Sequence, residues 1–271
     1  MPPLDLLAWL RQECANYTFD ARGVFQRSGA NSQWPLNAAD GDDLERVLAD
    51  RGHLLPLPKE PAALANVLEV SIVNFLTERL ASVPDATVVK GTERGYPDLE
   101  ISGEAFGDGF HAVDVKAARR AETKKRPRTQ SRITLYTGNT YFKWPDLKWP
   151  GTMRPFNDYS GHLDLLLIYT LKPETSARVT DLEVIVHEPW RIASRQRSST
   201  TREYIGAVDG LDDLREGRGQ FATPDEFYTY WRKFPFKVSA QVQRQFERLV
   251  RQQAHELDQL RRRSLGGSAD V

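Results

Sequence analysis

The sequence has one cysteine, no long apolar run and no excess of charge of either sign. A single cysteine excludes an intrachain disulfide and agrees with a reducing compartment, so we expect a cytoplasmic protein. No apolar stretch approaches the roughly 20 residues of a membrane helix, and the N-terminus lacks the pattern of a signal peptide. With 37 basic and 37 acidic residues the chain is not a global polycation, and any binding of nucleic acid must use local patches.

The feature that says most about function is a pair of short motifs in the middle of the chain. Pro97-Asp98 is followed sixteen residues after Asp98 by Asp114, which opens the tripeptide Asp114-Val115-Lys116. Two converging carboxylates make the oxygen-rich site that Mg²⁺ prefers, with water and phosphate oxygens as the other ligands. This combination indicates a metal-dependent phosphodiesterase, although such a motif also arises by chance in soluble chains of this length.

The residues around the motifs predict that both acids lie in one β-hairpin. Residues 98–102 and 110–116 read as strands, and glycines and Asp108 between them supply a turn. Residues two apart in a strand share a face, so Asp114 and Lys116 point together while Val113 and Val115 enter the core. Charges at the ends of apolar strands are costly without a partner such as a metal or a lysine, which favours a site over a chance motif.

The remaining pattern predicts a mixed α/β fold with a central sheet flanked by helices. Residues 62–80 have apolar side chains at helical spacing, residues 4–14 form a shorter apolar helix, and residues 235–263 are helical by pattern. Residues 163–171 are almost continuously apolar, as in a strand covered on both faces, and residues 182–186 form another strand. We expect one compact unit over residues 1–271, with a packing or dimer-stabilising helical segment at 235–265.

Several blocks, in matching order and spacing, make the chain resemble the EcoRV family of restriction endonucleases, which are PD-(D/E)xK nucleases. Besides the two motifs, they include Arg154-Pro155-Phe156-Asn157-Asp158-Tyr159 and the stretch from Glu216 to Arg232. The resemblance implies a restriction-endonuclease core over residues 92–234 and a small dimerisation hairpin within residues 17–40. It also implies a bacterial homodimer that cleaves double-stranded DNA, paired with a cognate methyltransferase.

Roles for the site residues follow from chemistry first and from the resemblance second. Asp98 and Asp114 would bind Mg²⁺, with Mn²⁺ able to substitute, and Lys116 would orient the attacking water and stabilise the transition state. The alternative for Lys116 is a surface lysine at a strand end. By resemblance only, Glu69 would add an acidic group from a helix, and the backbone carbonyl of Val115 would be a further ligand.

Residues that contact DNA are expected in four loops. The run from Arg119 to Arg132 has seven basic residues and one acid, so it is either a phosphate-binding segment that starts at Arg119 or a solvated loop. The resemblance places base reading at residues 198–204 and a minor-groove loop at residues 92–94. Glu93 and Arg94 are candidates for contacts in that groove, and the alternative for Arg94 is a surface turn. Arg suits guanine and Glu suits cytosine, so we expect a G·C-richer target, although Arg202 could contact only phosphate. The full set expected here is Glu93, Arg94, Arg119, Thr137, Asn139, Thr140, Ser198, Ser199, Thr200, Thr201, Arg202, Glu203 and Tyr204.

The function expected is therefore a type II site-specific deoxyribonuclease that cuts a short palindrome and leaves 5′-phosphate, blunt ends. Three alternatives remain open at this point. A repair or recombination nuclease of the same fold would act on structured DNA. A sequence-specific DNA-binding protein without catalysis would bind but never cut, and a structural protein would carry the motif by accident.

Overall fold

The computed structural model describes residues 2–19, 40, 42–43, 46, 61–92, 95–122, 126–172 and 179–266, with side chains described as far as residue 259. Its main element is a five-stranded sheet in the order β1-β2-β3-β5-β6. The strands are β1 (Thr87–Lys90), β2 (Leu99–Ser102), β3 (Phe110–Arg119), β5 (Gly161–Leu171) and β6 (Val179–His187). β3 and β5 are parallel and the other neighbours are antiparallel, so the sheet is mixed, as the sequence predicts.

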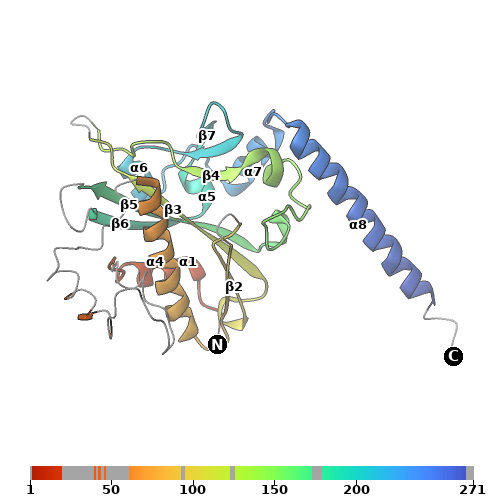
Figure 1. The fold of residues 1–271 in the computed structure, drawn as a ribbon, viewed down its shortest axis with the longest axis horizontal. Coiled ribbons are helices and arrows are strands. Elements are labelled where there is room, and N and C mark those ends of the chain that lie inside the picture. The colour runs from red at the N-terminus through yellow and green to blue at the C-terminus, as the bar shows by residue number, and fades with distance from the viewer. Residues whose placement is uncertain are drawn as a thin grey trace.

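Two helices cover one face of this sheet (Figure 1). They are α1 (Leu6–Cys14) and α4 (Pro61–Ala81), which bury a row of leucines against Val113 and Val115 of β3 and against Leu165 of β5. α1 begins at Asp5, whose side chain accepts a hydrogen bond from the backbone of Ala8 at 3.1 Å and so caps the helix. Both helices were expected from the apolar spacing, with boundaries that differ by one or two residues.

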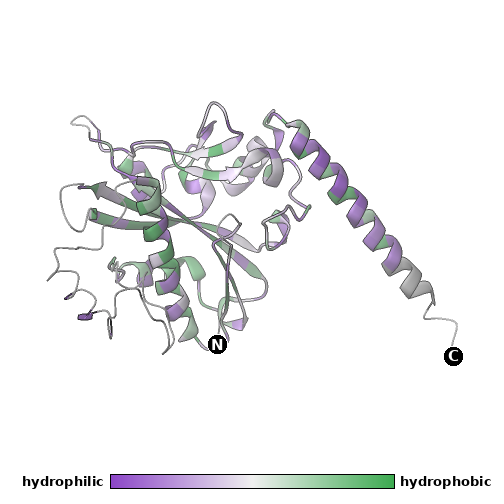
Figure 2. Ribbon diagram, in the orientation of Figure 1, coloured by the Kyte–Doolittle hydropathy of each residue, from purple (hydrophilic) through white to green (hydrophobic). Residues whose placement is uncertain are grey.

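The other face packs against a second, three-stranded sheet and short helices. This sheet has the order β4-β8-β7, with β4 (Thr134–Thr137), β7 (Ala193–Arg197) and β8 (Tyr204–Ala207). The helices near it are α5 (Pro189–Ile192), α6 (Leu211–Glu216) and α7 (Pro224–Lys233), together with the short turns η2 (Gly138–Phe142) and η3 (Phe156–Asp158). The turn η1 (Glu104–Phe106) lies on the face covered by α1, where Phe106 packs against Trp9. Tyr136, Phe142 and Trp231 are buried here against Leu166 of β5. The almost continuous apolar character of β5 follows from this cover on both faces, and Figure 2 colours the central strands as hydrophobic.

α8 (Ala240–Gly266) leaves this body and extends away from it (Figure 1). It was expected from residue 235, but it starts after Ser239, whose hydroxyl accepts a hydrogen bond from the backbone of Val242 at 3.3 Å. Phe246 stacks on Trp144 with the ring centroids 4.4 Å apart, so the first turns of α8 pack on the body. Farther along, Val250 and Leu257 are 40% and 55% exposed, and the dimer-stabilising role stays a prediction. The predicted dimerisation hairpin at 17–40 falls almost entirely outside the described residues.

Candidate active site

Asp98 and Asp114 face each other across the β2–β3 hairpin. β2 and β3 pair with Leu99 opposite Val113, which places Asp98 beside Asp114. The turn uses Gly103, Gly107 and Gly109, all at positive φ, a conformation that other residues adopt only with strain. The predicted hairpin is therefore confirmed, and it brings the two motifs together.

The site is built on an open edge of β3. β2 pairs only with residues 110–113, so beyond this point the backbone on that side has no partner strand among the described residues. Side chains take over these groups: Oδ2 of Asp98 accepts from the N–H of Val115 at 2.6 Å, and Oε1 of Glu69 accepts from the N–H of Ala117 at 3.1 Å. Because the N–H and C=O of one strand residue point the same way, the Val115 carbonyl also faces this edge.

Lys116 lies within the same group of oxygen atoms. Its ammonium is 2.6 Å from Oδ2 of Asp114 and donates to the carbonyl of Val115 at 3.1 Å. Val113 and Val115 are buried in the core beneath, as the strand alternation predicts. Lys116 is therefore paired with the carboxylate two residues before it, and it is not simply a solvated lysine at a strand end.

Burial and charge shift the protonation of this group in opposite directions. Burial raises the pKa of Asp114 to about 7, with Lys116 lowering it and Asp98 raising it. Burial alone would lower the pKa of Lys116, but the charges of Asp114, Asp98 and Glu69 raise it above the ordinary value. Burial also raises the pKa of Glu69. Lys116 is therefore held as a cation, and its single positive charge does not balance the carboxylates around it.

The donor atoms fit a hard divalent cation. Asp98, Asp114 and the Val115 carbonyl supply oxygen ligands, and the Lys116 ammonium contacts two of these groups, Asp114 and the Val115 carbonyl. Among the described residues no group of three or more His, Cys, Asp or Glu side chains could hold a metal. A pair of carboxylates with a carbonyl is nevertheless a usual Mg²⁺ set, since phosphate and water complete it.

The expected base-reading residues form the connection between β7 and β8. The hydroxyl of Ser199 accepts from the backbone of Thr201 at 3.2 Å and of Arg202 at 3.3 Å, which closes a local turn. Arg202 is exposed and lies 5.8 Å above the ring of Tyr204. Glu203 is different, because its side chain is only 11% exposed and pairs with Arg197, while Oε2 accepts from the backbone of Lys237 at 3.1 Å.

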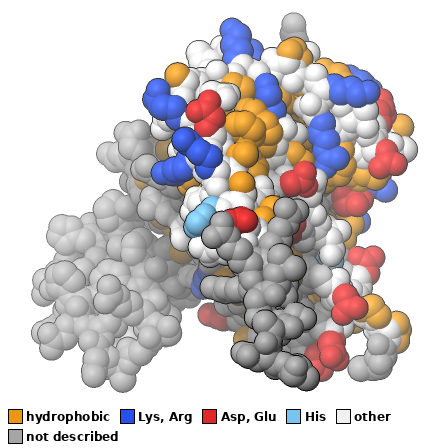
Figure 3. All heavy atoms as spheres, turned by 90° about the vertical axis from the view of Figure 1, so that its right-hand side faces the viewer, with side chains coloured by type: hydrophobic (Ala, Val, Ile, Leu, Met, Phe, Trp, Pro, Cys, Tyr) orange, Lys and Arg blue, Asp and Glu red, His pale blue; other side chains and the backbone are white. Residues whose placement is uncertain are grey.

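The other expected DNA contacts are spread over neighbouring segments. Thr137 ends β4, Asn139 donates to the carbonyl of Lys237 at 3.1 Å, and Thr140 donates to the carbonyl of Thr137 at 3.3 Å. Arg119 is the last residue of β3, the strand that carries Asp114 and Lys116. Glu93 and Arg94 lie outside the described residues. Figure 3 views the molecule from the right-hand side of Figure 1 and shows Lys and Arg side chains spread over the upper part of this face.

Part of the basic run is held within the protein. Arg120 pairs with Glu183, Arg126 pairs with Asp213, and Arg132 donates to Ser194 and Gln196. In this structure these guanidinium groups bind other side chains of the protein. Residues 123–125 lie outside the described part of the chain, and the phosphate-binding role of the run stays a prediction.

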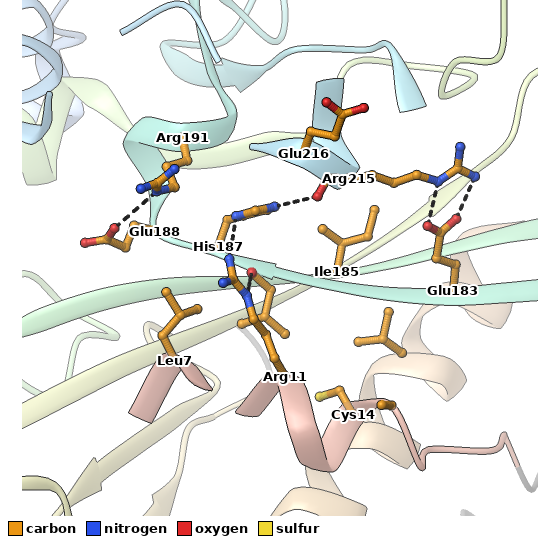
Figure 4. A pocket seen from close by; sticks show the side chains of 13 residues that line it. Leu7, Arg11, Cys14, Glu183, Ile185, His187, Glu188, Arg191, Arg215 and Glu216 are labelled. Carbon is orange, nitrogen blue, oxygen red and sulfur yellow. Dashed lines mark hydrogen bonds and ion pairs between the residues drawn. The ribbon is translucent and has the colours of Figure 1, made fainter. Parts of the chain in front are cut away.

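A large cavity lies away from the two motifs. It has a volume of about 570 Å³ and lies between α1, β6 and α6. Figure 4 shows its polar residues contacting one another: Arg11 bonds to His187, His187 to the carbonyl of Arg215, and Arg215 to Glu183. Neither Asp98, Asp114 nor Lys116 lines it, so we do not place the chemistry here.

Two buried acids near the site were not singled out from the sequence. Glu100, two residues after Asp98, forms a two-point ion pair with Arg154 at 2.8 and 3.1 Å and accepts from Tyr159 at 3.1 Å. Asp164 is fully buried on β5. The signal for Asp164 is one carboxylate inside the apolar run of residues 163–168.

A Pro-Asp before one strand and an Asp-x-Lys on the next, at the open edge of a mixed sheet, are the arrangement of the PD-(D/E)xK nuclease class. The family described as "Restriction endonuclease EcoRV" matches residues 30–256. The type II restriction enzyme EcoRV of Escherichia coli is 22% identical over 211 residues, which cover 71% of this chain and 82% of the relative. The chain belongs to the EcoRV restriction endonuclease family, and it is a type II restriction endonuclease, a hydrolase. No helix in the described part of the chain is long and apolar enough to cross a membrane.

Proposed function

We propose that the protein hydrolyses phosphodiester bonds of double-stranded DNA at a short palindromic sequence, with Mg²⁺ held by Asp98, Asp114 and the carbonyl of Val115. The observation that carries this proposal is the Lys116 ammonium 2.6 Å from Asp114, beside an oxygen donor set on the open edge of β3. When bound, the ion neutralises the scissile phosphate and lowers the pKa of a nearby water.

The chain's own residues supply positioning and charge. Asp98 and Glu69 are tied to backbone N–H groups of β3, so their carboxylates are fixed relative to Lys116. Lys116, held protonated, hydrogen-bonds a non-bridging phosphate oxygen and stabilises the negative charge that grows in the transition state. The water oxygen bonds to phosphorus, the bond from phosphorus to O3′ breaks, and a proton reaches O3′, which gives 5′-phosphate and 3′-hydroxyl ends.

A palindromic target requires a two-fold symmetric reader, so we propose a homodimer with one site per strand. Blunt ends follow if the two sites of the dimer cut phosphates directly opposite each other on the two strands. Sequencing of the product termini tests this point, and staggered ends contradict it. A companion methyltransferase and a location in the bacterial cytoplasm belong to the same proposal, since a restriction endonuclease needs a protected host genome.

The test is cleavage of a long sequenced viral DNA by the purified protein with Mg²⁺. EDTA and Lys116→Ala are the controls, and every new end is sequenced. Discrete fragments that share one short palindrome, absent from both controls, support the proposal. Cleavage confined to junctions or lesions supports a repair nuclease, and binding without any product supports a non-catalytic reader; either result overturns the proposal.

A further inference from the structure

Asp164 lies next to the catalytic strand and has no role in the site as described so far. β5 pairs in parallel with β3, and the register places Asp164 directly beside Asp114. Paired residues on adjacent strands project from the same face, so both carboxylates point toward the same space. Asp164 is 0% exposed and Asp114 is 4% exposed, so water does not solvate this pair freely.

One oxygen of Asp164 is left without a partner. Oδ2 accepts from the hydroxyl of Tyr136 at 3.2 Å, whereas Oδ1 is buried and has no hydrogen bond among the described residues. On the other side, Asp164 is paired in register with His187 of β6. The two ring nitrogens of His187 contact Arg11 and the carbonyl of Arg215, so this ring is committed elsewhere. A buried carboxylate oxygen without a partner is costly, and some group absent from the chain would relieve that cost.

The local charge balance indicates what this group is. The ammonium of Lys116 lies 2.6 Å from Asp114, whereas Asp98 and Glu69 accept hydrogen bonds from backbone N–H groups of β3 and Asp164 accepts from the hydroxyl of Tyr136. Several buried carboxylates against one ammonium are compensated better by a doubly charged hard cation than by a neutral hydrogen-bond donor.

We propose that Asp164 is a cation-binding residue of the active site, which shares a divalent ion with Asp114 through its unpartnered Oδ1. Tyr136 fixes the carboxylate by holding Oδ2. This inference rests on the proposed function, because the ion is of the kind that the site uses for hydrolysis. It adds a third strand, β5, to a site that the motifs assign to β2 and β3 alone.

The experiment measures Mn²⁺ binding to the full-length protein in the absence of DNA, by electron paramagnetic resonance of the free ion. The variants are Asp164→Asn, which keeps size and removes charge, and Tyr136→Phe, which keeps the carboxylate and removes its hydrogen bond. Asp158→Asn, an exposed position on η3, is the matched control. We expect Asp164→Asn to weaken Mn²⁺ binding about tenfold or more, Tyr136→Phe to weaken it several-fold, and the control to match the wild type.

Thermal unfolding distinguishes loss of the ion-binding site from a simple loss of packing. In EDTA, Asp164→Asn should melt close to the wild-type temperature, because the amide keeps the size of the side chain and can still accept from Tyr136. In Mn²⁺ the wild type should gain stability that the variant lacks, since a ligand stabilises the state that binds it. Wild-type affinity and a wild-type Mn²⁺ shift in Asp164→Asn overturn this inference and leave the proposed function intact. Absence of Mn²⁺ binding by the wild type at millimolar ion overturns both.

Discussion

The ammonium of Lys116 lies 2.6 Å from Oδ2 of Asp114, two residues earlier on the same strand. The contact exists because both side chains leave the same face of β3, while the backbone beside them has no partner strand in the part of the chain that the structure describes. Asp98, just before β2, and Glu69, on α4, accept hydrogen bonds from that backbone. The site therefore depends on where β2 begins as much as on the motif residues.

We predict that Lys116→Ala lowers the single-turnover cleavage rate by about 10²–10³-fold, the usual effect of removing one group that stabilises transition-state charge. Rate measurements at saturating Mg²⁺ with a cognate duplex test this. DNA affinity measured with Ca²⁺ should change little, because the lysine acts at one phosphate. Equal losses in affinity and rate would mean that Lys116 serves binding and not the chemical step.

The stability of the metal-free protein should depend on pH through Asp114. Its pKa is raised by burial from 3.8 to about 7 in the folded state, so the folded protein holds this proton more tightly than the unfolded chain. Its contribution is greatest below about pH 4 and is lost as the pH rises through 7, by at most on the order of 4 kcal/mol. Denaturant unfolding in EDTA checks this, and Asp114→Asn should flatten the profile. Identical pH profiles for the two proteins would contradict the assignment.

Arg202 and Glu203 are adjacent, yet we predict different effects from their substitution. Arg202→Ala should reduce discrimination against single base-pair changes by about 1–3 kcal/mol at the position it reads, with the melting temperature unchanged. Glu203→Gln should lower stability by roughly 1–3 kcal/mol, because Arg197 loses its charged partner. Binding assays on a panel of substituted duplexes and thermal melts separate them. A uniform loss over all sequences for Arg202→Ala would make it a phosphate contact.

The sequence predicted the catalytic hairpin, the long helix α4 and the cover on both faces of β5. It did so because strand alternation, helical spacing and apolar runs are local patterns. The contacts of Glu203 with Arg197, six residues away across the β7–β8 connection, and with Lys237, 34 residues away, depend on how these segments fold together, which no local pattern contains. Asp164 was passed over for a similar reason, since its place beside Asp114 arises only from the parallel register of β3 and β5.

Cys14 should be unreactive toward thiol reagents in the folded protein. Its side chain is buried at the end of α1, and burial, aided by the charge of Glu13, raises its pKa to about 12, so little thiolate exists at neutral pH. Titration with a disulfide reagent should therefore give slow labelling that follows unfolding, and one thiol per chain in guanidinium. Rapid stoichiometric labelling of the native protein would contradict this placement.

Glu100 should matter for stability and not for the chemical step. It is 5% exposed and is the partner of both Arg154 and Tyr159, and Arg154 also lies over the ring of Phe110. Glu100→Ala leaves the guanidinium unpaired at a partly buried position, and we expect a loss of about 2–4 kcal/mol. Glu104→Ala, an exposed acid in the turn after β2, is the matched control and should change stability by less than about 0.5 kcal/mol. Equal destabilisation by the two variants would show that the contacts of Glu100 with Arg154 and Tyr159 contribute little to the free energy of unfolding.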